Sequence, residues 1–448
     1  MSPSPPGPPS LAEAARTWAR IGLLSFGGPA GQIALLHRVL VEEKGWLDER
    51  RFLHALQVCM LLPGPEAHQL VVYTGRLLHG VRGGIVAGAL FVLPGLLAIL
   101  VLSLLYVTLG TLPLLQAALL GLRAAVIAIV LEAVFRIGRR MLGHPAMVGL
   151  ALLAFLALFA FRIPFPAVVL AAGLLGWLGG RLGLPSFLGA GLDHGPDPPE
   201  LARSGPDRTG RLLAIGLALW LAPLVLAILL LGPGHPLVAI GRLASELALL
   251  GFGGAYAVLA YTAQVAVEHH GWLAPSEMLD GLALAEAVPG PLVLVLAFVG
   301  FLAAFRGPAP LDSMPAGILG GGLAAWAIFV PSCLLALASV PYSERVRRHA
   351  TLSAVLAAIG AAACGAIAFL ALRFALHGVF LVVETVRFGP LALELPVLAS
   401  WNPVACLLAL LALVAVFRFR LALGPLLLGG AGAGVVLYLL RFELLGFL

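Results

Sequence analysis

Long apolar runs, separated by short stretches rich in Pro, Gly or charged residues, dominate the chain. The fullest runs cover residues 84–107, 112–135, 145–161, 166–177, 212–231, 401–417 and 421–440. A helix needs about 20 predominantly apolar residues to cross a bilayer, so the pattern predicts an all-α, polytopic integral membrane protein with about 10 to 13 membrane segments. Because the runs are continuous and do not alternate, they exclude an outer-membrane β-barrel.

Several apolar segments are interrupted, or are too short to cross a bilayer alone. Residues 11–41 predict a helix that is interrupted at the string SFGGPAGQ. Residues 52–62 and 66–78 flank Pro63-Gly64-Pro65, which we call the first corner. Residues 52–62 would form a helix about 16 Å long, which is about half of the hydrocarbon core. We expect re-entrant or broken helices here, although an ordinary turn at the membrane interface fits the same residues.

The chain contains an internal repeat. Leu24–Pro65 aligns without a gap on Leu250–Pro291 at a constant offset of 226 residues, and 16 of these 42 positions are identical. The string FGG recurs, and so does PGP, at Pro289-Gly290-Pro291, which we call the second corner. We therefore expect two homologous halves, at residues 11–191 and 212–448. A polar linker is expected at residues 192–211 and a disordered, Pro-rich tail at residues 1–10.

The distribution of basic residues predicts how the two halves are oriented. Residues 37–55 contain Arg38, Lys44, Arg50 and Arg51, whereas their counterparts at residues 263–281 contain no Lys or Arg. Because cytoplasmic loops attract Lys and Arg, the first segment should face the cytoplasm and the second should face away from it. The extra apolar run at residues 212–231 supplies the additional crossing that this arrangement needs. We expect an inverted-topology repeat.

Composition narrows the function classes. Of the 448 residues, 61% are hydrophobic and 11% are charged, against about 25% charged in soluble domains. The net charge of +6 is attributed to cytoplasmic loops, so the expected partner is the lipid bilayer and not nucleic acid. The four cysteines are scattered and form no C-x-x-C motif, so no metal and no cofactor are expected. The sequence has no H-E-x-x-H and no G-x-S-x-G motif, so an enzyme is not predicted.

The interrupted segments predict an anion site. The helix that follows each corner directs free N–H groups and the positive end of its dipole towards the break, and helix N-termini bind anions. Paired, interrupted segments in corresponding places of two halves point to the binding site of a transporter. The alternative for the FGG strings is that their glycines only allow close helix packing.

Three ionisable residues in apolar surroundings are further candidates. Arg123 lies about ten residues from either end of its apolar run, so it is either an oxyanion ligand or a member of a structural ion pair, for example with Glu132. Glu66 follows the first corner and Glu286 precedes the second, and either carboxylate could carry a coupling proton. For Glu66, the alternative is that it only complements the helix dipole.

The long strings around both corners resemble a known family. FGGPAGQIALLHRVLVEEKGWLDERRFLHALQVCMLLPGPEAHQ and FGGAYAVLAYTAQVAVEHHGWLAPSEMLDGLALAEAVPGP are similar to the two half-signatures of the long chromate ion transporters. The resemblance implies export of chromate from the cytoplasm across the bacterial inner membrane, driven by the proton motive force or the membrane potential and conferring chromate resistance. It carries over as site residues Phe26, Gly27, Gly28, Pro29, Gln32, Pro63, Gly64, Pro65 and Glu66, with Phe252, Gly253, Gly254, Glu286, Pro289, Gly290 and Pro291 in the second half.

The residues alone leave several alternatives open. Sulfate is a tetrahedral dianion of similar size to chromate, and nothing in the spacing of the motifs separates the two. A transporter of another small oxyanion and a passive anion channel also fit the pattern, and a homodimer stays one option for the assembly.

Overall fold

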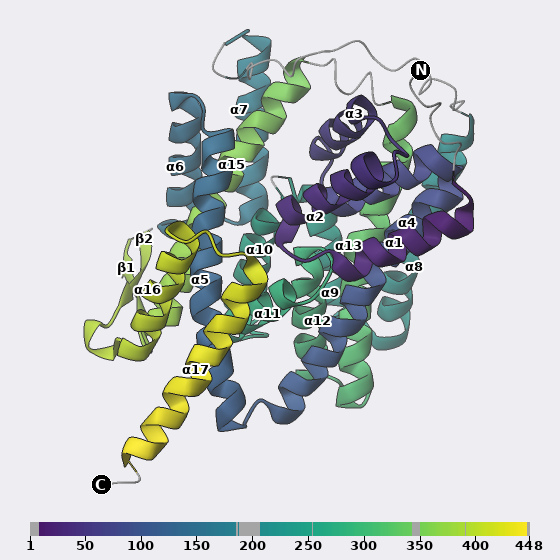
Figure 1. Cartoon of the computed structure of the whole chain (residues 1–448). Helices are drawn as coiled ribbons and strands as arrows, with labels where there is room; N and C mark the ends of the chain where they lie inside the picture. The colour runs from purple at the N-terminus through teal and green to yellow at the C-terminus, as the bar shows by residue number, and fades with distance from the viewer. Residues whose placement is uncertain are drawn as a thin grey trace.

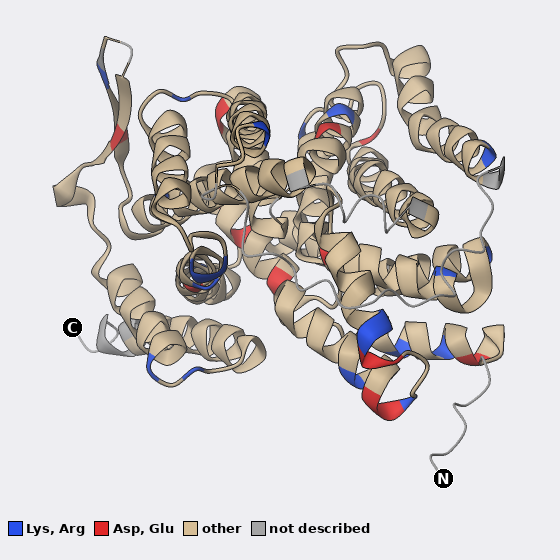
Figure 2. Cartoon of the chain, turned by 90° about the horizontal axis from the view of Figure 1, so that it is seen from above, with Lys and Arg blue, Asp and Glu red and all other residues tan. Residues whose placement is uncertain are grey.

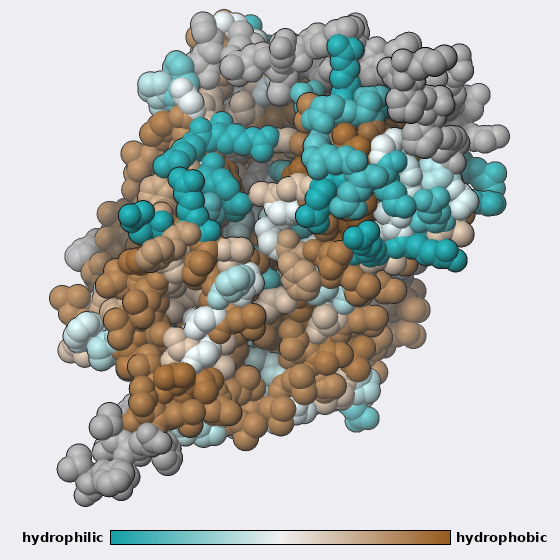
Figure 3. Space-filling model, in the orientation of Figure 1, coloured by the Kyte–Doolittle hydropathy of each residue, from teal (hydrophilic) through white to brown (hydrophobic). Residues whose placement is uncertain are grey.

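The computed structural model describes residues 9–184, 187, 207–252, 254–342, 350–389 and 391–445, and it is built almost entirely of helices (Figure 1). Within these residues, six helices are long and apolar enough to cross a membrane, and four shorter apolar helices accompany them. The predicted all-α, polytopic membrane architecture is confirmed. Side chains of high hydropathy cover the lower part of the face shown in Figure 3, and hydrophilic side chains gather on its upper part, on both sides of a hollow.

The first half is a series of helices with one long kinked member. Its elements are α1 (Leu11–Leu24), α2 (Gly28–His37), π-helix η1 (Arg38–Glu43), α3 (Glu49–Met60), α4 (Glu66–Leu109), α5 (Pro113–Met141), α6 (Pro145–Phe159) and α7 (Phe165–Arg181). Within α4 the backbone leaves helical geometry at His79 and at Gly80, whose φ is 64°. The short helix expected at residues 66–78 therefore ends where the sequence predicted.

The second half begins with one additional helix, α8 (Asp207–Leu231). Its other elements are α9 (Pro236–Leu250), α10 (Ala255–Ala263), π-helix η3 (Gln264–His269), α11 (Pro275–Ala287), 3₁₀-helix η4 (Leu292–Leu294), α12 (Val295–Arg306), α13 (Ser313–Ser339), η5 (Val340–Tyr342), α15 (Ala350–Val379), strands β1 (Val383–Phe388) and β2 (Leu391–Pro396), η6 (Leu398–Ser400), α16 (Pro403–Phe417) and α17 (Leu423–Leu445). The last five residues assigned to the linker, 207–211, belong to α8, so that boundary was placed too late; the rest of the linker and residues 1–8 of the tail lie outside the described residues.

Elements at matching positions recur in the two halves. At the offset of 226 residues, α9, α10 and α11 correspond to α1, α2 and α3, and η3 covers the same six positions as η1. The π-helix is rare and is often found at functional sites, so its recurrence is informative. The segment from η4 to the end of α12 corresponds to the part of α4 before the kink. Whether the two halves have opposite orientations in the membrane stays a prediction.

The two halves are interlocked, because each central helix packs against the last helix pair of the other half. Helix α5 packs against α16 and α17, and α15 packs against α6 and α7. Small residues make this possible: a Cβ added to Gly121 would lie 1.9 Å from the carbonyl oxygen of Gly430, and one added to Gly365 would lie 2.1 Å from that of Ala151. Such small-residue contacts let membrane helices approach closely.

Charged residues gather where α2, η1 and α3 follow one another, near the N-terminal part of the chain. Figure 2 shows basic and acidic residues close together there. His37 at the end of α2 lies 2.6 Å from Glu49 on α3, and this hydrogen bond raises the pKa of His37. Lys44 pairs with Glu13 of α1 at 3.1 Å. This solvent-facing cluster joins α2 to α3, and α1 to the residue that follows η1, at the end that the sequence assigns to the cytoplasm.

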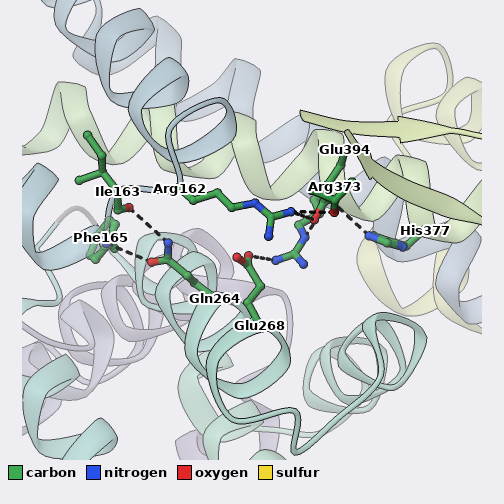
Figure 4. A network of polar contacts seen from close by, with 9 residues as sticks. Arg162, Ile163, Phe165, Gln264, Glu268, Arg373, His377 and Glu394 are labelled. Carbon is green, nitrogen blue, oxygen red and sulfur yellow. Dashed lines mark hydrogen bonds and ion pairs between the residues drawn. The ribbon is translucent and has the colours of Figure 1, made fainter. Parts of the chain in front are cut away.

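An antiparallel hairpin of β1 and β2 is an addition that the hydrophobic pattern did not predict. It lies at one edge of the helical body (Figure 1). A group of ionic side chains, which we call the clasp, attaches it (Figure 4): Arg373 of α15 pairs with Glu268 of η3 and, at 3.2 Å, with Glu394 of β2. Arg162, in the α6–α7 connection, pairs with Glu394 at 3.3 Å. The clasp therefore joins four separate parts of the chain.

Candidate functional site

Each corner is hydrogen-bonded to the broken helix of the other half. The amide of Gly64 in the first corner donates to the carbonyl oxygen of Gly251 at 3.2 Å, and the amide of Gly290 in the second donates to that of Ser25 at 2.9 Å. These two hydrogen bonds join equivalent positions, since Gly251 and Gly290 lie 226 residues after Ser25 and Gly64. We call residues 25–27 and 251–254 the first and second breaks. Each corner of one half therefore lies against the break of the other half.

Glycine is required in both corners for backbone reasons. The φ angles of Gly64 and Gly290 are 116° and 110°, a region that L-residues with a side chain rarely adopt. A Cβ on Gly64 would also lie 3.1 Å from Nε2 of Gln69 and 3.3 Å from Oγ of Ser332. The conformation of each corner therefore depends on its central glycine.

Two buried glutamines stabilise these corners. The amide nitrogen of Gln32 donates to the carbonyl oxygen of Gly290 at 2.5 Å and to that of Ser25 at 3.3 Å. The amide nitrogen of Gln69 donates to the carbonyl oxygen of Pro63 at 2.6 Å. Gln32 was predicted to bind the substrate. In the structure its side chain instead donates to backbone carbonyl oxygens that the breaks leave without a helical partner.

The four helices that begin at the breaks and corners have no side-chain cap. Helices α2, α4, α10 and η4 begin after Gly27, Pro65, Gly254 and Pro291, and at none of them does the capping side chain accept a hydrogen bond. Helices α1, α3, α6, α9 and α16 are capped by Ser10, Asp48, His144, His235 and Asn402, whereas α5, α7 and α13 also lack a side-chain cap. The first turn of an uncapped helix leaves N–H groups available for another acceptor, so this region is suited to an anion.

A cavity of about 580 Å³ adjoins the first break. Its lining includes Gly27, Tyr256 and Glu286, together with the arginines Arg136, Arg139 and Arg420. Glu286 is only 4% exposed, and its Oε1 accepts a hydrogen bond of 3.0 Å from the hydroxyl of Tyr256. The structure therefore brings one proton-coupling candidate and the N-terminal end of α2 to the same space.

The second proton-coupling candidate lies at the other break. A Cβ added to Gly254 would lie 3.6 Å from Oε1 of Glu66, so this carboxylate of the first half faces the second half. The two carboxylates do not occupy equivalent positions, because the counterparts of Glu66 and Glu286 are Leu292 and Met60. The two halves therefore share a backbone arrangement but place their carboxylates at different positions.

The other predicted residues have different surroundings. Phe26 is 47% exposed, while Phe252 is half-buried and packs against the core. Gly28 and Gly254 have positive φ angles, of 66° and 87°. Gly253 lies outside the described residues. Pro65, Gly290 and Pro291 are buried, and Pro63 and Pro289 are half-buried.

Arg123 is already paired with a carboxylate. Its Nε and Nη2 donate to the two carboxylate oxygens of Asp280 at 2.6 and 2.7 Å, and the hydroxyl of Tyr106 donates to the same carboxylate at 2.9 Å. Asp280 is fully buried, whereas Glu132 pairs with Arg136 at 3.4 Å. The suggested pair with Glu132 was wrong, because the partner of Arg123 is Asp280, which joins α5 to α11. The role of Arg123 as an anion ligand stays a prediction.

Sequence reasoning missed several residues that the structure brings forward. Asp280 lies in the apolar string EMLDGLALAEAV, and an intramembrane carboxylate is a signal that calls for a partner. Tyr256 follows the second FGG string at a distance of two residues. The arginines of the cavity come from α5 and from the loop between α16 and α17. Nothing in the sequence indicates that these two segments lie close together.

Comparisons with known protein sequences show the family of this chain. The model of the chromate transporter family matches residues 12–177 and 238–436. A chromate transport protein of Pseudomonas aeruginosa is 34% identical over 367 residues, covering 81% of this chain and 80% of that relative. One from Cupriavidus metallidurans is 28% identical over 350 residues, covering 78% of each chain, and a probable chromate transport protein of Synechococcus elongatus is 29% identical over 363 residues, covering 80% of this chain and 83% of that relative. No solved structure matches significantly. This chain belongs to the chromate transporter family.

Proposed function

We propose that this protein transports chromate across the bacterial inner membrane, in the direction from the cytoplasm outwards, and so confers chromate resistance. Membership of the family and the names of its similar relatives support the substrate. The observation that carries the site is the pair of reciprocal hydrogen bonds between corners and breaks, beside four helix ends that have no side-chain cap. The cytoplasmic end is taken to be the one that bears the basic η1–α3 segment.

The proposed binding mode uses backbone amides. An anion near a helix N-terminus gains about 0.3 to 1 kcal/mol, and up to about 2 kcal/mol where the geometry is partly buried. A tetrahedral dianion offers four oxygens, so it can accept from several helix ends at once. The proposed ligands are the amides in the first turns of the helices that begin at the two breaks and corners, because the amides of Gly64 and Gly290 themselves already donate to Gly251 and Ser25. Phe26, Gly27, Gly64, Gly254 and Gly290 form the surrounding backbone.

Coupling to protons is assigned to Glu286 and Glu66. Glu286 is buried beside Tyr256 at the cavity, and Glu66 faces the second break. A carboxylate in each place would exchange a proton as the dianion arrives or leaves. We propose that the two halves have opposite orientations, so that each carboxylate is reached from one side of the membrane.

Two other functions use the same frame. Sulfate has the same shape and charge as chromate, and uncapped amides do not distinguish their oxygens. A passive anion channel needs the same ligands and differs only in its independence of a proton gradient.

The test is uptake of radiolabelled chromate by everted membrane vesicles. We expect uptake that depends on an imposed proton gradient and that an excess of sulfate reduces, because the amides do not distinguish the two anions. Glu286→Gln should abolish the dependence on the gradient. Preferred uptake of sulfate would favour the sulfate transporter, and flux that ignores the gradient in the unmodified protein would favour the channel. Vesicles that take up neither anion would contradict the proposal.

A further inference from the structure

Three arginines line the cavity next to the first break, and we call them the arginine vestibule. Arg136 and Arg139 lie on α5, and Arg420 lies in the loop between α16 and α17, so the vestibule joins the two halves of the chain. The same cavity of about 580 Å³ reaches Gly27 and Glu286. Its arginines are therefore in one continuous space with the proposed binding region.

Two of the three arginines keep their charge available. Arg136 forms an ion pair with Glu132 at 3.4 Å, and Glu286 accepts a hydrogen bond from the hydroxyl of Tyr256. Within the described part of the chain, neither Arg139 nor Arg420 has a carboxylate within 4.0 Å. The neighbouring Arg140 is directed elsewhere, because its Nη2 donates to the sulfur of Met60 at 2.9 Å.

The backbone of Arg420 is unusual. Its φ is 51°, in the left-handed region, which L-residues with a side chain rarely adopt. Among the described residues other than glycine, only Arg162 shares this feature, with a φ of 50°, and its guanidinium pairs with Glu394 of the clasp at 3.3 Å. At Arg162 the strained turn delivers a guanidinium to an anionic group, and at Arg420 it delivers one to a cavity wall. Such strain is often retained at functional positions.

The walls of the cavity strengthen the field of these charges. Phe135 and Phe417 meet edge to face with their ring centres 5.5 Å apart, and Ile129, Leu423 and Leu426 complete an apolar lining. The lining holds three arginines against the two acids Glu132 and Glu286, so the cavity has an excess of positive charge. A cleft with such an excess and with walls of low dielectric raises the local concentration of counter-ions. Arginine suits an oxyanion because its planar guanidinium presents several N–H donors.

We propose that Arg139 and Arg420 form an anion-collecting site for a divalent tetrahedral oxyanion, ahead of the central site. This inference rests on the proposed function, because it names the residues that bring the substrate to the breaks. The dianion binds between the two guanidinium groups and passes to the helix ends near Gly27. Arg136 contributes less, since Glu132 neutralises part of its charge.

The test combines transport and binding by Arg139→Gln, Arg420→Gln and the double variant. In vesicles the KM for chromate should rise about fivefold in each single variant and tenfold or more in the double variant, with kcat within twofold, because the loss is one of electrostatic capture. The KM of the unmodified protein should rise with ionic strength, and that of the double variant should change little.

Matched controls separate this role from a structural one. Arg418→Gln removes a positive charge from the α16–α17 loop, outside the lining of the cavity, and it should leave KM unchanged. Arg139→Lys with Arg420→Lys should restore KM to within about threefold of the original value, because the charge returns. Gel-filtration profiles of the purified variants establish that each one is folded.

Equilibrium binding of radiolabelled chromate to the purified protein keeps the two proposals separate. A Kd that weakens about tenfold in the double Gln variant and not in the controls supports the vestibule, whether or not vesicles transport chromate. An unchanged KM, salt dependence and Kd in the double variant would overturn the vestibule while transport by the unmodified protein stands. The absence of both uptake and binding in the unmodified protein would overturn both proposals.

Discussion

At the residue scale, the close approach of single atoms decides whether the corners can form. Gly95 of α4 lies against the second corner, and a Cβ added there would be 1.9 Å from the carbonyl oxygen of Pro289. Backbone cannot yield as a flexible side chain can. The glycine is therefore required by the position of the second corner and not by the flexibility of α4.

Gly95→Ala should destabilise the protein by about 1 to 3 kcal/mol, the usual cost of overpacking a core, and should reduce transport because the second corner moves. The measurement is the thermal unfolding midpoint in detergent, together with vesicle uptake. Gly149→Ala in α6 is the control, since an added Cβ meets nothing within 4 Å there. Equal unfolding midpoints for the two variants would refute the close approach.

The ion pair of Arg123 and Asp280 separates a structural role from a ligand role. Arg123→Ala leaves the buried carboxylate of Asp280 unpaired, which typically costs about 3 to 5 kcal/mol, so expression and the unfolding midpoint should fall. Arg123→Met combined with Asp280→Leu should restore both, because apolar replacements of a buried pair are often tolerated. A stable double variant without transport would support Arg123 as an anion ligand.

The sequence alone identified Arg123 as a candidate, but it did not identify Asp280 as its partner. Arg123 was noticed because it lies deep in an apolar run, but its partner is 157 residues away, on a helix of the other half. The nearest acid on its own helix was Glu132, which is why that pairing was suggested. Local pattern predicts that a buried charge needs a partner, whereas only the packing of α5 on α11 identifies which one.

At the element scale, the clasp attaches the β1–β2 hairpin to the helical body. Arg373 has a side chain that is 8% exposed, and it separates two acids, Glu268 and Glu394. His377 lies 3.4 Å from Glu394 on the same side (Figure 4). Because Glu268 lies on η3, the clasp also fixes the end of the second broken helix.

Arg373→Ala should lower the unfolding midpoint and expose the hairpin to protease, because Glu268 then loses its paired cation and Glu394 keeps only Arg162 as a paired arginine. A loss of about 3 to 5 kcal/mol is expected for breaking a buried pair. The control is Arg387→Ala on β1, because Arg387 is exposed. Identical digestion of the hairpin in both variants would show that the clasp does not hold it.

The elements could be predicted where the pattern was local. The break near residues 25–27, the short helix 66–78 and the extra run at 212–231 all follow from Gly, Pro and run length. The hairpin could not be found, because the strand sequences VETVRF and LALELP lie among apolar runs and depend on ion pairs to distant helices. The linker boundary failed because Asp207–Arg211 is polar yet continues an apolar helix.

At the scale of the whole molecule, the repeat explains why the two corners lie where they do. Each corner is bonded to the break of the other half, and each central helix packs against the final helices of the other half. Neither half buries its own surface alone, so we expect the halves to fold together. The sequence repeat predicted two related halves, but the exchange of partners between them required the long-range packing.

The most direct test of the account is the orientation of two matched positions in the membrane. Glu43 and His269 are exposed counterparts at the offset of 226 residues, and each is replaced in turn by cysteine in a chain that has no other cysteine. An impermeant maleimide is then applied to intact and to permeabilised cells. The account predicts that His269→Cys is labelled in intact cells and that Glu43→Cys is labelled only after permeabilisation. Labelling of both positions from the same side would contradict a site built from two oppositely oriented halves.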